Sequence, residues 1–343
     1  MKRLLVVRLG SLGDLVHTLP AVSAIHRTFP AAEIDWLVDA PHRDFLALVP
    51  LLASVIVLRD RSAGAWLAAR SELRARAYDV ALDFQGLLKS AALARLSGAQ
   101  RVIGFTRKAA REGLAAPFYS MRVEAGASQH VIEKNLALAG SIGAATDTLE
   151  FPLIQTDSRV VTAVRDALAR AGLPATYALI NPGAAWPNKR WPPAAFGRVA
   201  ALIRDRHGLA SIVLWGPGEQ EMAATIVQSS AGAAVAAPAT SLHDLVALAR
   251  HARLIVSGDT GPLHIAAAVK VPAVGLYGPT NPRRNGPWSE QDECISRYDA
   301  CDCHYERRCR RDDAHWCLGS ISVDEVAAAI DRRLGQAVNP ATA

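Results

Sequence analysis

One segment, residues 254–280, constrains the fold of this chain more than any other. It opens with an apolar run at 254–256, turns at Gly258-Asp259, and reaches Gly261-Pro262, where a helix can begin. Proline suits the first helical turn because the N–H group that it lacks would have no partner there. A second apolar run follows at 271–277. This order of strand, turn, helix and strand predicts a βαβ unit and therefore a parallel sheet.

The turn of this unit is also a candidate site. It lies where the carboxyl end of a strand meets the amino end of a helix, and the unpaired N–H groups of that helix favour an anion such as phosphate. Asp259 and Thr260 are polar residues at this turn and can hold sugar or nucleotide hydroxyls. The alternative is that Asp259 only caps the helix.

The same alternation of short apolar runs and helical patterns recurs on both sides of a Pro-containing stretch near residue 152. Before it, the patterns predict strands at 3–8, 33–38, 54–58 and 79–83, and helices at about 42–50, 65–77, 87–97 and 131–141. After it, they predict strands at 177–180 and 211–215, and helices at 193–206, 219–230 and 241–251, with a last helix at 322–334. The pattern loosens and becomes basic between residues 101 and 122.

These patterns predict an α/β protein with two Rossmann-like domains that face a cleft. The expected boundaries are an N-terminal domain over 1–155, a C-terminal domain over 156–320 with a Cys-rich insertion at 290–317, and a terminal helix and tail over 321–343.

Composition narrows the partners. The formal net charge is +6, which favours an anionic partner, although a generally basic surface is the simpler explanation. Aromatic residues are only 6% of the chain, whereas a nucleic-acid-binding surface would need them clustered with basic residues. The longest apolar runs fall short of the roughly 18 residues of a membrane span, and the N-terminus does not resemble a signal peptide. We therefore expect a cytoplasmic protein.

Loops after other strands carry further candidates. The stretch from Gly10 to Asp14 lacks both the G-x-G-x-x-G spacing and a P-loop lysine, but Asp14 can serve as a general base or as a helix cap. Lys189 and Arg190 follow the strand at 177–180 and can neutralise a diphosphate, or they are solvated loop cations. Glu219 or Glu221 can bind ribose hydroxyls.

The cysteines lie close together near the C-terminus, outside these strand-end loops. All five fall in an Arg-rich stretch: Cys294, Cys301, Cys303, Cys309 and Cys317. Thiolates at this density can bind zinc, yet the spacing lacks paired C-x-x-C knuckles. A structural metal held by the last four, a disulfide, and free thiols all remain open, and catalysis by a metal is not expected.

Five segments resemble the bacterial lipopolysaccharide heptosyltransferases, whose two-Rossmann architecture is called GT-B. The similar segments are Gly10-Ser11-Leu12-Gly13-Asp14 with His17-Thr18-Leu19-Pro20, Asp83-Phe84-Gln85-Gly86-Leu87-Leu88-Lys89-Ser90, Lys189-Arg190-Trp191-Pro192, Asp259-Thr260-Gly261-Pro262-Leu263-His264, and Tyr277-Gly278-Pro279-Thr280. They span nearly the whole chain in the order of the family. The second segment looks most like heptosyltransferase I.

The resemblance implies an inverting, metal-independent transfer of heptose from ADP-L-glycero-D-manno-heptose to the Kdo region of the lipopolysaccharide inner core. It implies that Asp14 deprotonates the acceptor hydroxyl, that Lys189 and the N–H groups near Gly261 stabilise the diphosphate, and that Asp259 contacts the heptose. The implied donor site comprises Ala184, Ala185, Glu219, Asp259, Thr260, Gly261, Pro262 and His264. Family members often have hydroxyl residues where this chain has Ala184 and Ala185.

The resemblance also suggests a partner for the basic stretch, since the acceptor carries phosphates and acidic sugars at the inner face of the inner membrane. The implied acceptor-binding residues are Gly13, Lys89, Arg101, Arg107, Lys108, Arg111 and Arg122. No cofactor beyond the donor substrate and no nucleic acid is expected. The alternatives are a related GT-B enzyme that uses another nucleotide sugar and, less in keeping with the motifs, a nucleotide-sugar oxidoreductase or epimerase.

Overall fold

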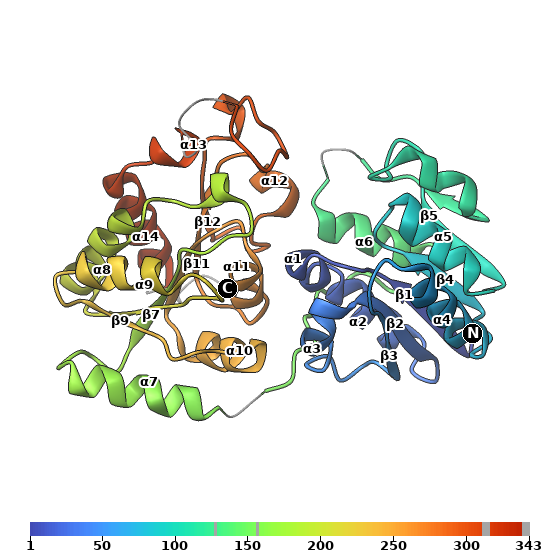
Figure 1. Ribbon diagram of the computed structural model, residues 1–343, viewed down its shortest axis with the longest axis horizontal. Helices are drawn as coiled ribbons and strands as arrows, with labels where there is room; N and C mark the ends of the chain where they lie inside the picture. The colour runs from blue at the N-terminus through green and yellow to red at the C-terminus, as the bar shows by residue number, and fades with distance from the viewer. Residues whose placement is uncertain (127–128, 156–157, 311–315, 338–343) are drawn as a thin grey trace. The chain divides into compact units, whose positions relative to one another are not determined.

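The structure is a computed structural model that describes residues 1–126, 129–155, 158–310 and 316–337, and it divides into two compact units, 1–154 and 155–343 (Figure 1). Each unit has one six-stranded sheet in which every described strand pair is parallel. Parallel pairing on this scale requires crossover connections, and helices supply most of them.

The first unit contains β1 (Arg3–Val7), α1 (Leu12–Val16), α2 (Leu19–Thr28), β2 (Glu33–Asp39), η1 (Ala40–His42), α3 (Arg43–Leu46), β3 (Ser54–Leu58), α4 (Ala63–Arg74), β4 (Val80–Asp83), α5 (Leu88–Leu96), β5 (Arg101–Phe105), η2 (Gly113–Phe118), β6 (Met121–Val123) and α6 (Val131–Gly140). Its strand order is β3-β2-β1-β4-β5-β6.

The second unit begins with α7 (Arg159–Arg170), β7 (Tyr177–Asn181), η3 (Pro187–Lys189), α8 (Pro193–His207), β8 (Ala210–Val213), α9 (Gln220–Gln228), β9 (Ala234–Ala236), α10 (Leu242–His251) and β10 (Leu254–Gly258). It continues with α11 (Gly261–Ala268), β11 (Ala273–Tyr277), α12 (Pro282–Asn285), β12 (Glu293–Ser296), η4 (Tyr298–Ala300), α13 (Trp316–Gly319) and α14 (Val323–Ala337). Its strand order is β12-β11-β10-β7-β8-β9.

The two sheets have the same topology. When the strands of each unit are counted from its own first strand, both sheets read 3-2-1-4-5-6, the Rossmann order. In that order the chain reverses direction across the sheet between the first and fourth strands, and ligands bind outside the carboxyl ends of those strands. The loops after β1 and β4 in the first unit, and after β7 and β10 in the second, therefore define where a site is expected.

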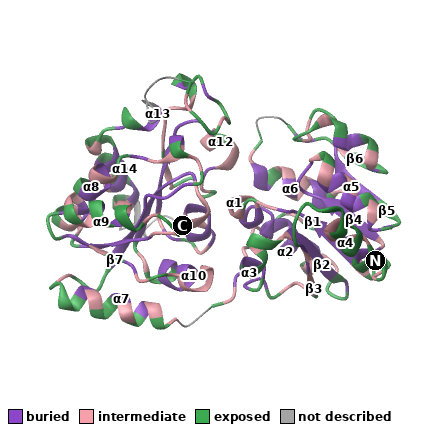
Figure 2. Ribbon diagram, in the orientation of Figure 1, coloured by how far each residue is buried: buried purple, intermediate pink, exposed green. Residues whose placement is uncertain are grey.

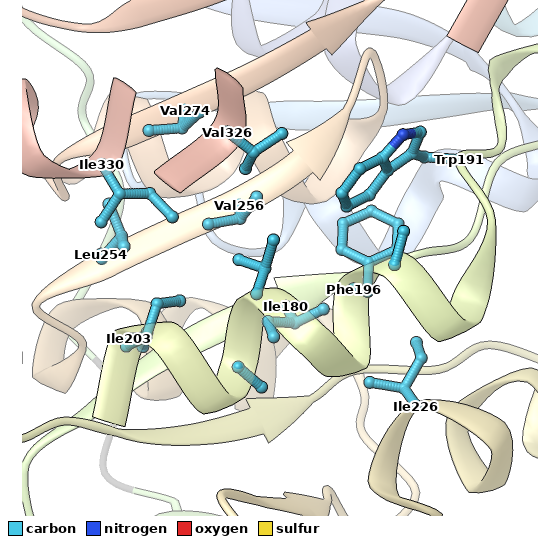
Figure 3. Close-up of a cluster of buried hydrophobic side chains, with 14 of the residues drawn as sticks. Ile180, Trp191, Phe196, Ile203, Ile226, Leu254, Val256, Val274, Val326 and Ile330 are labelled. Atoms are coloured by element: carbon cyan, nitrogen blue, oxygen red, sulfur yellow. The ribbon is translucent and has the colours of Figure 1, made fainter. Parts of the chain in front are cut away.

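Burial explains why the strands were visible in the sequence. The central strands of both sheets are buried on both faces (Figure 2), so β7, β10 and β11 appear as continuous apolar runs. In the second unit, Trp191, Phe196 and Ile203 pack over this sheet, and Val326 and Ile330 of α14 complete the same core (Figure 3). Thus α14 belongs to the core of the second unit.

Several predicted boundaries need correction. The helix expected at 42–50 is only the four-residue α3, and the stretch 101–122, expected to be irregular, contains β5 and β6. Charged residues at 101 and within 107–111 flank the buried run of β5, and they obscured its apolar pattern in the sequence. The three-residue strand β9 and the strand β12 were also missed, and β12 completes the second sheet within the stretch expected to be a Cys-rich insertion.

Two separate helices flank Pro20: α1 ends at Val16, and α2 begins at Leu19 with Pro20 in its first turn. Ser158 and Ser241 each cap a helix, since their hydroxyls accept from the N–H groups of Val160 and Asp244. Within the described residues, no helix has the length and apolar character needed to cross a bilayer.

Candidate functional site

The second unit has a polar network at the carboxyl ends of β7, β10 and β11, and Asp259 is at its centre. One carboxylate oxygen of Asp259, Oδ2, lies 2.6 Å from Lys189 Nζ and 2.7 Å from Thr280 Oγ1. The other, Oδ1, lies 2.9 Å from Asn285 Nδ2 and 3.1 Å from His264 Nε2. Each oxygen therefore has two polar partners, while Asp259 itself is only 6% exposed.

The charge state of Asp259 follows from these partners. Burial opposes ionisation, but the hydrogen bond from His264 and the charge of Lys189 outweigh it and hold the pKa of Asp259 well below its usual range. The carboxylate is thus ionised at neutral pH. With Asp259 ionised, Nε2 of His264 is assigned as the protonated ring nitrogen that donates to it.

A second group of contacts shapes the start of α11. The side-chain amide of Asn181, at the end of β7, donates to Ser257 Oγ and Thr260 Oγ1, each at 3.0 Å. Thr260 is the N-cap residue of α11, yet its side chain makes no capping hydrogen bond. The first N–H groups of α11 therefore lie at the carboxyl edge of β10 with the partial positive charge of a helix amino end.

Lys189 is held in place by its surroundings. Lys189 is the last residue of η3, and its Nζ lies 4.5 Å from the centre of the Trp186 ring. A Cβ atom on Gly258 would lie only 2.7 Å from the backbone carbonyl oxygen of Lys189, which is too close. Glycine at 258 thus allows the Lys189 loop to approach the end of β10. The ammonium group is anchored by Asp259 while it remains partly exposed, at 14% of its side chain.

The other residues expected at the donor site lie at the same edge. The carbonyl of Ala184 accepts from Arg190 Nε at 2.9 Å, and Ala185 is exposed. Glu219 accepts from the N–H group of Gly216 at 2.9 Å, and its carboxylate occupies the space that a Cβ on Gly183 would need. Glu219 therefore joins the loops after β7 and β8, whereas Glu221 is exposed.

In the first unit, Asp14 lies in α1 and pairs with Arg8, which directly follows β1. Arg8 Nη2 lies 2.5 Å from Asp14 Oδ1, and the N–H group and hydroxyl of Ser11 lie 3.2 and 3.3 Å from Asp14 Oδ2. Asp14 therefore takes part in capping α1, as the N3 residue of a capping box whose N-cap is Ser11, and it remains a partly exposed carboxylate at the sheet edge.

Other titratable groups surround this edge. A Cβ atom on Gly10 would lie only 2.6 Å from Nε2 of the His42 ring, which explains why glycine occupies position 10. Burial lowers the pKa of His42 against the opposing charges of Asp39 and Asp14, so the ring is neutral at pH 7. Lys89 Nζ lies 3.4 Å from Asp39 Oδ2.

Asp83, at the end of β4, is fully buried and accepts four hydrogen bonds. Oδ2 accepts from Tyr119 Oη at 2.7 Å and Ser90 Oγ at 2.8 Å, and Oδ1 accepts from the N–H groups of Gln85 and Gly86. This arrangement holds the segment 85–90 that carries part of the family resemblance. Burial raises the pKa of Asp83 against the effect of these hydrogen bonds.

The structure separates the expected acceptor-binding residues into two groups. The loop after β5 packs on the segment after β4, because the N–H group of Glu112 donates to Gly86 and its carboxylate accepts from Leu88. The exposed basic residues of this loop, which follows the carboxyl end of β5, are Arg107, Lys108 and Arg111. Gly13 in α1 and Lys89 in α5 likewise follow the carboxyl ends of strands, β1 and β4.

Arg101 and Arg122 do not join that group. Arg101 begins β5 and so lies at the opposite, amino edge of the parallel sheet, whereas Arg122 lies within β6 and donates through Nε to the Ala116 carbonyl at 2.8 Å. The structure therefore does not support a single basic surface over 101–122.

The sequence reasoning did not single out Arg8, His42, Thr280 or Asn285 as site residues. Arg8 offered a signal, since it is a cation directly after a strand that ends at the switch point, and Thr280 lies in a segment that carries the resemblance. Asn285 offered no signal, because it reaches Asp259 through the four-residue helix α12, which the sequence did not predict.

Comparison with known proteins agrees with this geometry. Residues 66–315 match the family described as glycosyltransferase family 9 (heptosyltransferase). The lipopolysaccharide heptosyltransferase 1 of Pseudomonas aeruginosa is 34% identical over 83% of this chain and 81% of its own, and that of Escherichia coli K12 is 32% identical over 82% and 89%.

Solved structures give the same result. The E. coli heptosyltransferase WaaC with ADP superposes with a TM-score of 0.72 at 26% identity, covering 98% of this chain and 99% of its own. The E. coli ADP-heptose lipopolysaccharide heptosyltransferase II has a TM-score of 0.74 at 23% identity over 98% and 100% of the two chains, which supports the fold alone.

The fold is therefore the α/β GT-B fold of two Rossmann-like domains, and the class of protein is a glycosyltransferase. The chain belongs to glycosyltransferase family 9 and is a lipopolysaccharide heptosyltransferase.

Proposed function

We propose that this enzyme transfers heptose from ADP-L-glycero-D-manno-heptose to the Kdo region of the lipopolysaccharide inner core, as heptosyltransferase I does. The observation that carries the proposal is the 34% identity to a lipopolysaccharide heptosyltransferase 1 over four-fifths of each chain. The choice of donor is supported by the similarity to the E. coli WaaC structures with ADP and with ADP-2-deoxy-2-fluoro heptose, at 26% and 27% identity.

In the proposed donor site, the diphosphate of ADP-heptose binds at the amino end of α11 and beside Lys189. Negative charge grows on the diphosphate as the bond to the anomeric carbon breaks, and a fixed ammonium group and helix N–H groups stabilise it. The loops that carry Ala184, Ala185 and Glu219 line the rest of the site, where backbone groups replace the hydroxyls that relatives often have at 184 and 185.

Asp259 acts in this proposal as a positioning residue. Its two oxygens already have four partners and it is almost fully buried, an arrangement that favours holding Lys189 and His264 over direct contact with heptose hydroxyls.

In the proposed acceptor site, Asp14 takes the proton from the attacking hydroxyl of the acceptor. Arg8 fixes one of the oxygens of Asp14 through their ion pair, and the neutral His42 adds no competing charge. We assign the anionic groups of the acceptor to Gly13, Lys89, Arg107, Lys108 and Arg111. An acceptor anchored in lipid then requires the enzyme to work at the inner face of the inner membrane. Each step uses this chain's own residues and the donor substrate.

Two measurements test this function. The first is the thermal shift of the protein with ADP-heptose, with UDP- and GDP-sugars, and with ADP alone; we expect a shift with the ADP ligands that is reduced in Lys189→Gln and retained in the matched variant Lys270→Gln, an exposed lysine of the same unit. A shift with UDP- or GDP-sugars instead would leave a related GT-B enzyme with a different donor.

The second measurement is heptose transfer to Kdo-containing lipid A, compared with the same acceptor already carrying one heptose. Heptosyltransferase I activity requires transfer to the first acceptor only. Transfer only to the acceptor that already carries heptose would refute the proposed acceptor and leave the family assignment intact.

A further inference from the structure

Four of the five cysteines gather in one cluster of the second unit, beyond the site described above. Cys301, Cys303 and Cys317 are 4%, 1% and 5% exposed, and the partly buried Cys309 packs against them. All are reduced. Within the described residues this cluster consists of cysteines alone. Free cysteines can pack as small apolar side chains, but four thiols from separate points of a 17-residue stretch that meet one another also form a set of soft metal ligands.

Two of the sulfur–sulfur distances can be compared with those of a tetrahedral metal site. Cys303 Sγ and Cys309 Sγ are 3.9 Å apart, and Cys301 Sγ and Cys317 Sγ are 3.1 Å apart. Metal–sulfur bonds of about 2.3 Å place neighbouring sulfurs of a tetrahedron about 3.8 Å apart. The first pair already has this spacing, whereas the second must open by about 0.7 Å. As they stand, no three His, Cys, Asp or Glu side chains in the described part of the chain are arranged to hold a metal ion, so metal entry requires this local adjustment.

Two backbone N–H groups are directed at the sulfurs of the cluster. The N–H group of Cys303 points to Cys301 Sγ at 3.3 Å, and that of Arg310 points to Cys303 Sγ at 3.0 Å. These contacts help to fix the positions of the two sulfurs. Four thiolates around one divalent ion carry a net charge of −2, and the nearby arginines at 307, 308 and 310 provide opposite charge.

A disulfide explains less of this geometry. Only Cys301 and Cys317 are close enough for a bond of about 2.05 Å to form after a small movement. A bond between them would not explain why Cys303 contacts Cys309, nor why a backbone N–H group is directed at the sulfur of Cys303.

We propose that Cys301, Cys303, Cys309 and Cys317 bind a single divalent metal ion, Zn²⁺ or Fe²⁺, as a structural tetrathiolate site. Four protein ligands leave no open coordination position, so the ion fixes structure and takes no part in sugar transfer. The class of metal follows from the ligands, because a tetrahedral set of four thiolates selects zinc or iron.

What the metal would fix is the segment that supports the donor loops. The N–H group of Tyr305 donates to Pro279, beside Thr280, and the side chain of Asn188, beside Lys189, donates to Glu306, each at 2.9 Å. Metal binding would therefore hold the two loops whose side chains meet at Asp259. This consequence for donor binding rests on the proposed function, whereas the metal site does not.

Elemental analysis of the full-length protein, purified under reducing conditions, tests the site. We expect one zinc or iron ion per chain, lost in Cys309→Ser and in Cys317→Ser. The matched variant is Cys294→Ser, since Cys294 lies on β12 outside the cluster, and it should keep the full metal content. Retained metal in both cluster variants would overturn the proposal.

A measurement on the wild-type protein guards against variants that fail to fold. After removal of the native metal with a chelator, titration with Co²⁺ should give one equivalent of binding with the visible absorption of a tetrahedral tetrathiolate, and metal return should raise the Tm. A wild-type protein that is isolated without metal and does not bind Co²⁺, or that is isolated with a Cys301–Cys317 disulfide, would refute the site.

Discussion

Asp83 and Asp259 lie at the carboxyl ends of corresponding strands in the two units and have opposite electrostatic character. Asp83 is the last residue of the fourth strand of its sheet and Asp259 directly follows the fourth strand of the other; each is almost fully buried and accepts four hydrogen bonds. The partners of Asp83 are neutral, and burial raises its pKa, whereas Lys189 and His264 lower the pKa of Asp259. A carboxylate at the end of the fourth strand thus organises a neutral loop in one unit and a cation in the other.

This difference separates the functions of the two sheet edges. In the first unit the buried Asp83 is not available to a substrate, whereas Asp14 is a partly exposed carboxylate, and we assign proton transfer to Asp14. The second unit uses its carboxylate to position a lysine, and we assign charge stabilisation to that lysine. Four predictions test this division, in order of expected effect.

Asp14→Asn should lower kcat by about 10²- to 10⁴-fold, because an amide cannot accept the acceptor proton. The affinity for ADP should stay the same, since we propose that the donor binds in the second unit. Steady-state transfer assays and calorimetry with ADP measure the two effects. The matched control is Asp44→Asn, an exposed aspartate of the first unit, which should keep wild-type kcat. Weakened ADP binding in Asp14→Asn would contradict the division.

Lys189→Gln should lower kcat/KM by about 10²- to 10³-fold, because the leaving diphosphate loses one fixed cation. Lys89→Gln removes a lysine from the equivalent edge of the first unit and should cost less than tenfold, with the loss in the KM of the acceptor. Comparable losses in the donor KM of both variants would show that the two edges do not have separate functions.

Asp259→Asn should reduce the free energy of unfolding by about 3 kcal/mol, because Lys189 is left partly buried without its carboxylate. Asp83→Asn should reduce it by less than about 1 kcal/mol, since an amide can keep bonds with hydroxyl and N–H partners. Urea unfolding at pH 7 gives both values. A lower stability of the Asp83 variant than of the Asp259 variant would contradict the idea that the cationic partners of Asp259 make it the more important carboxylate for stability.

The pH dependence should also have opposite signs. Asp259, with its lowered pKa, contributes stability above the ordinary aspartate pKa of about 3.9, and this contribution is lost as the pH falls below it. Asp83, with its raised pKa, favours the folded state when protonated, so its contribution falls as the pH rises from about 4 towards that raised value.

Urea unfolding from pH 3 to 8 separates these two contributions. The stability difference between wild type and Asp83→Asn should shift against wild type as the pH rises, and that between wild type and Asp259→Asn should shift in its favour. Parallel curves for the two variants would refute the assigned pKa directions.

The sequence predicted the central elements well and the peripheral ones poorly. Strands β1 and β4, at the centre of the first sheet, are within one residue of their expected ends, because a strand buried on both faces needs an uninterrupted apolar run. The edge strand β3 was also predicted with its correct ends, since its sequence is largely apolar although it is only partly buried. The strands β9 and β12 at the sheet edges are short and partly exposed, so no such run marks them. The strand β5 was obscured by the basic residues around it.

The sequence by itself predicted the two Rossmann units and indicated the strand-end loops of Asp14, Lys189 and Asp259, the residues to which we assign functions. Periodic burial and turn chemistry act over a few residues, and such patterns can be recognised in a linear chain. Only the tertiary structure decided what those residues contact: Arg8 beside Asp14, Thr280 and Asn285 around Asp259, and four cysteines in one cluster. These contacts depend on the paths of loops between strands, and a loop path is set by packing against distant segments that no local pattern specifies.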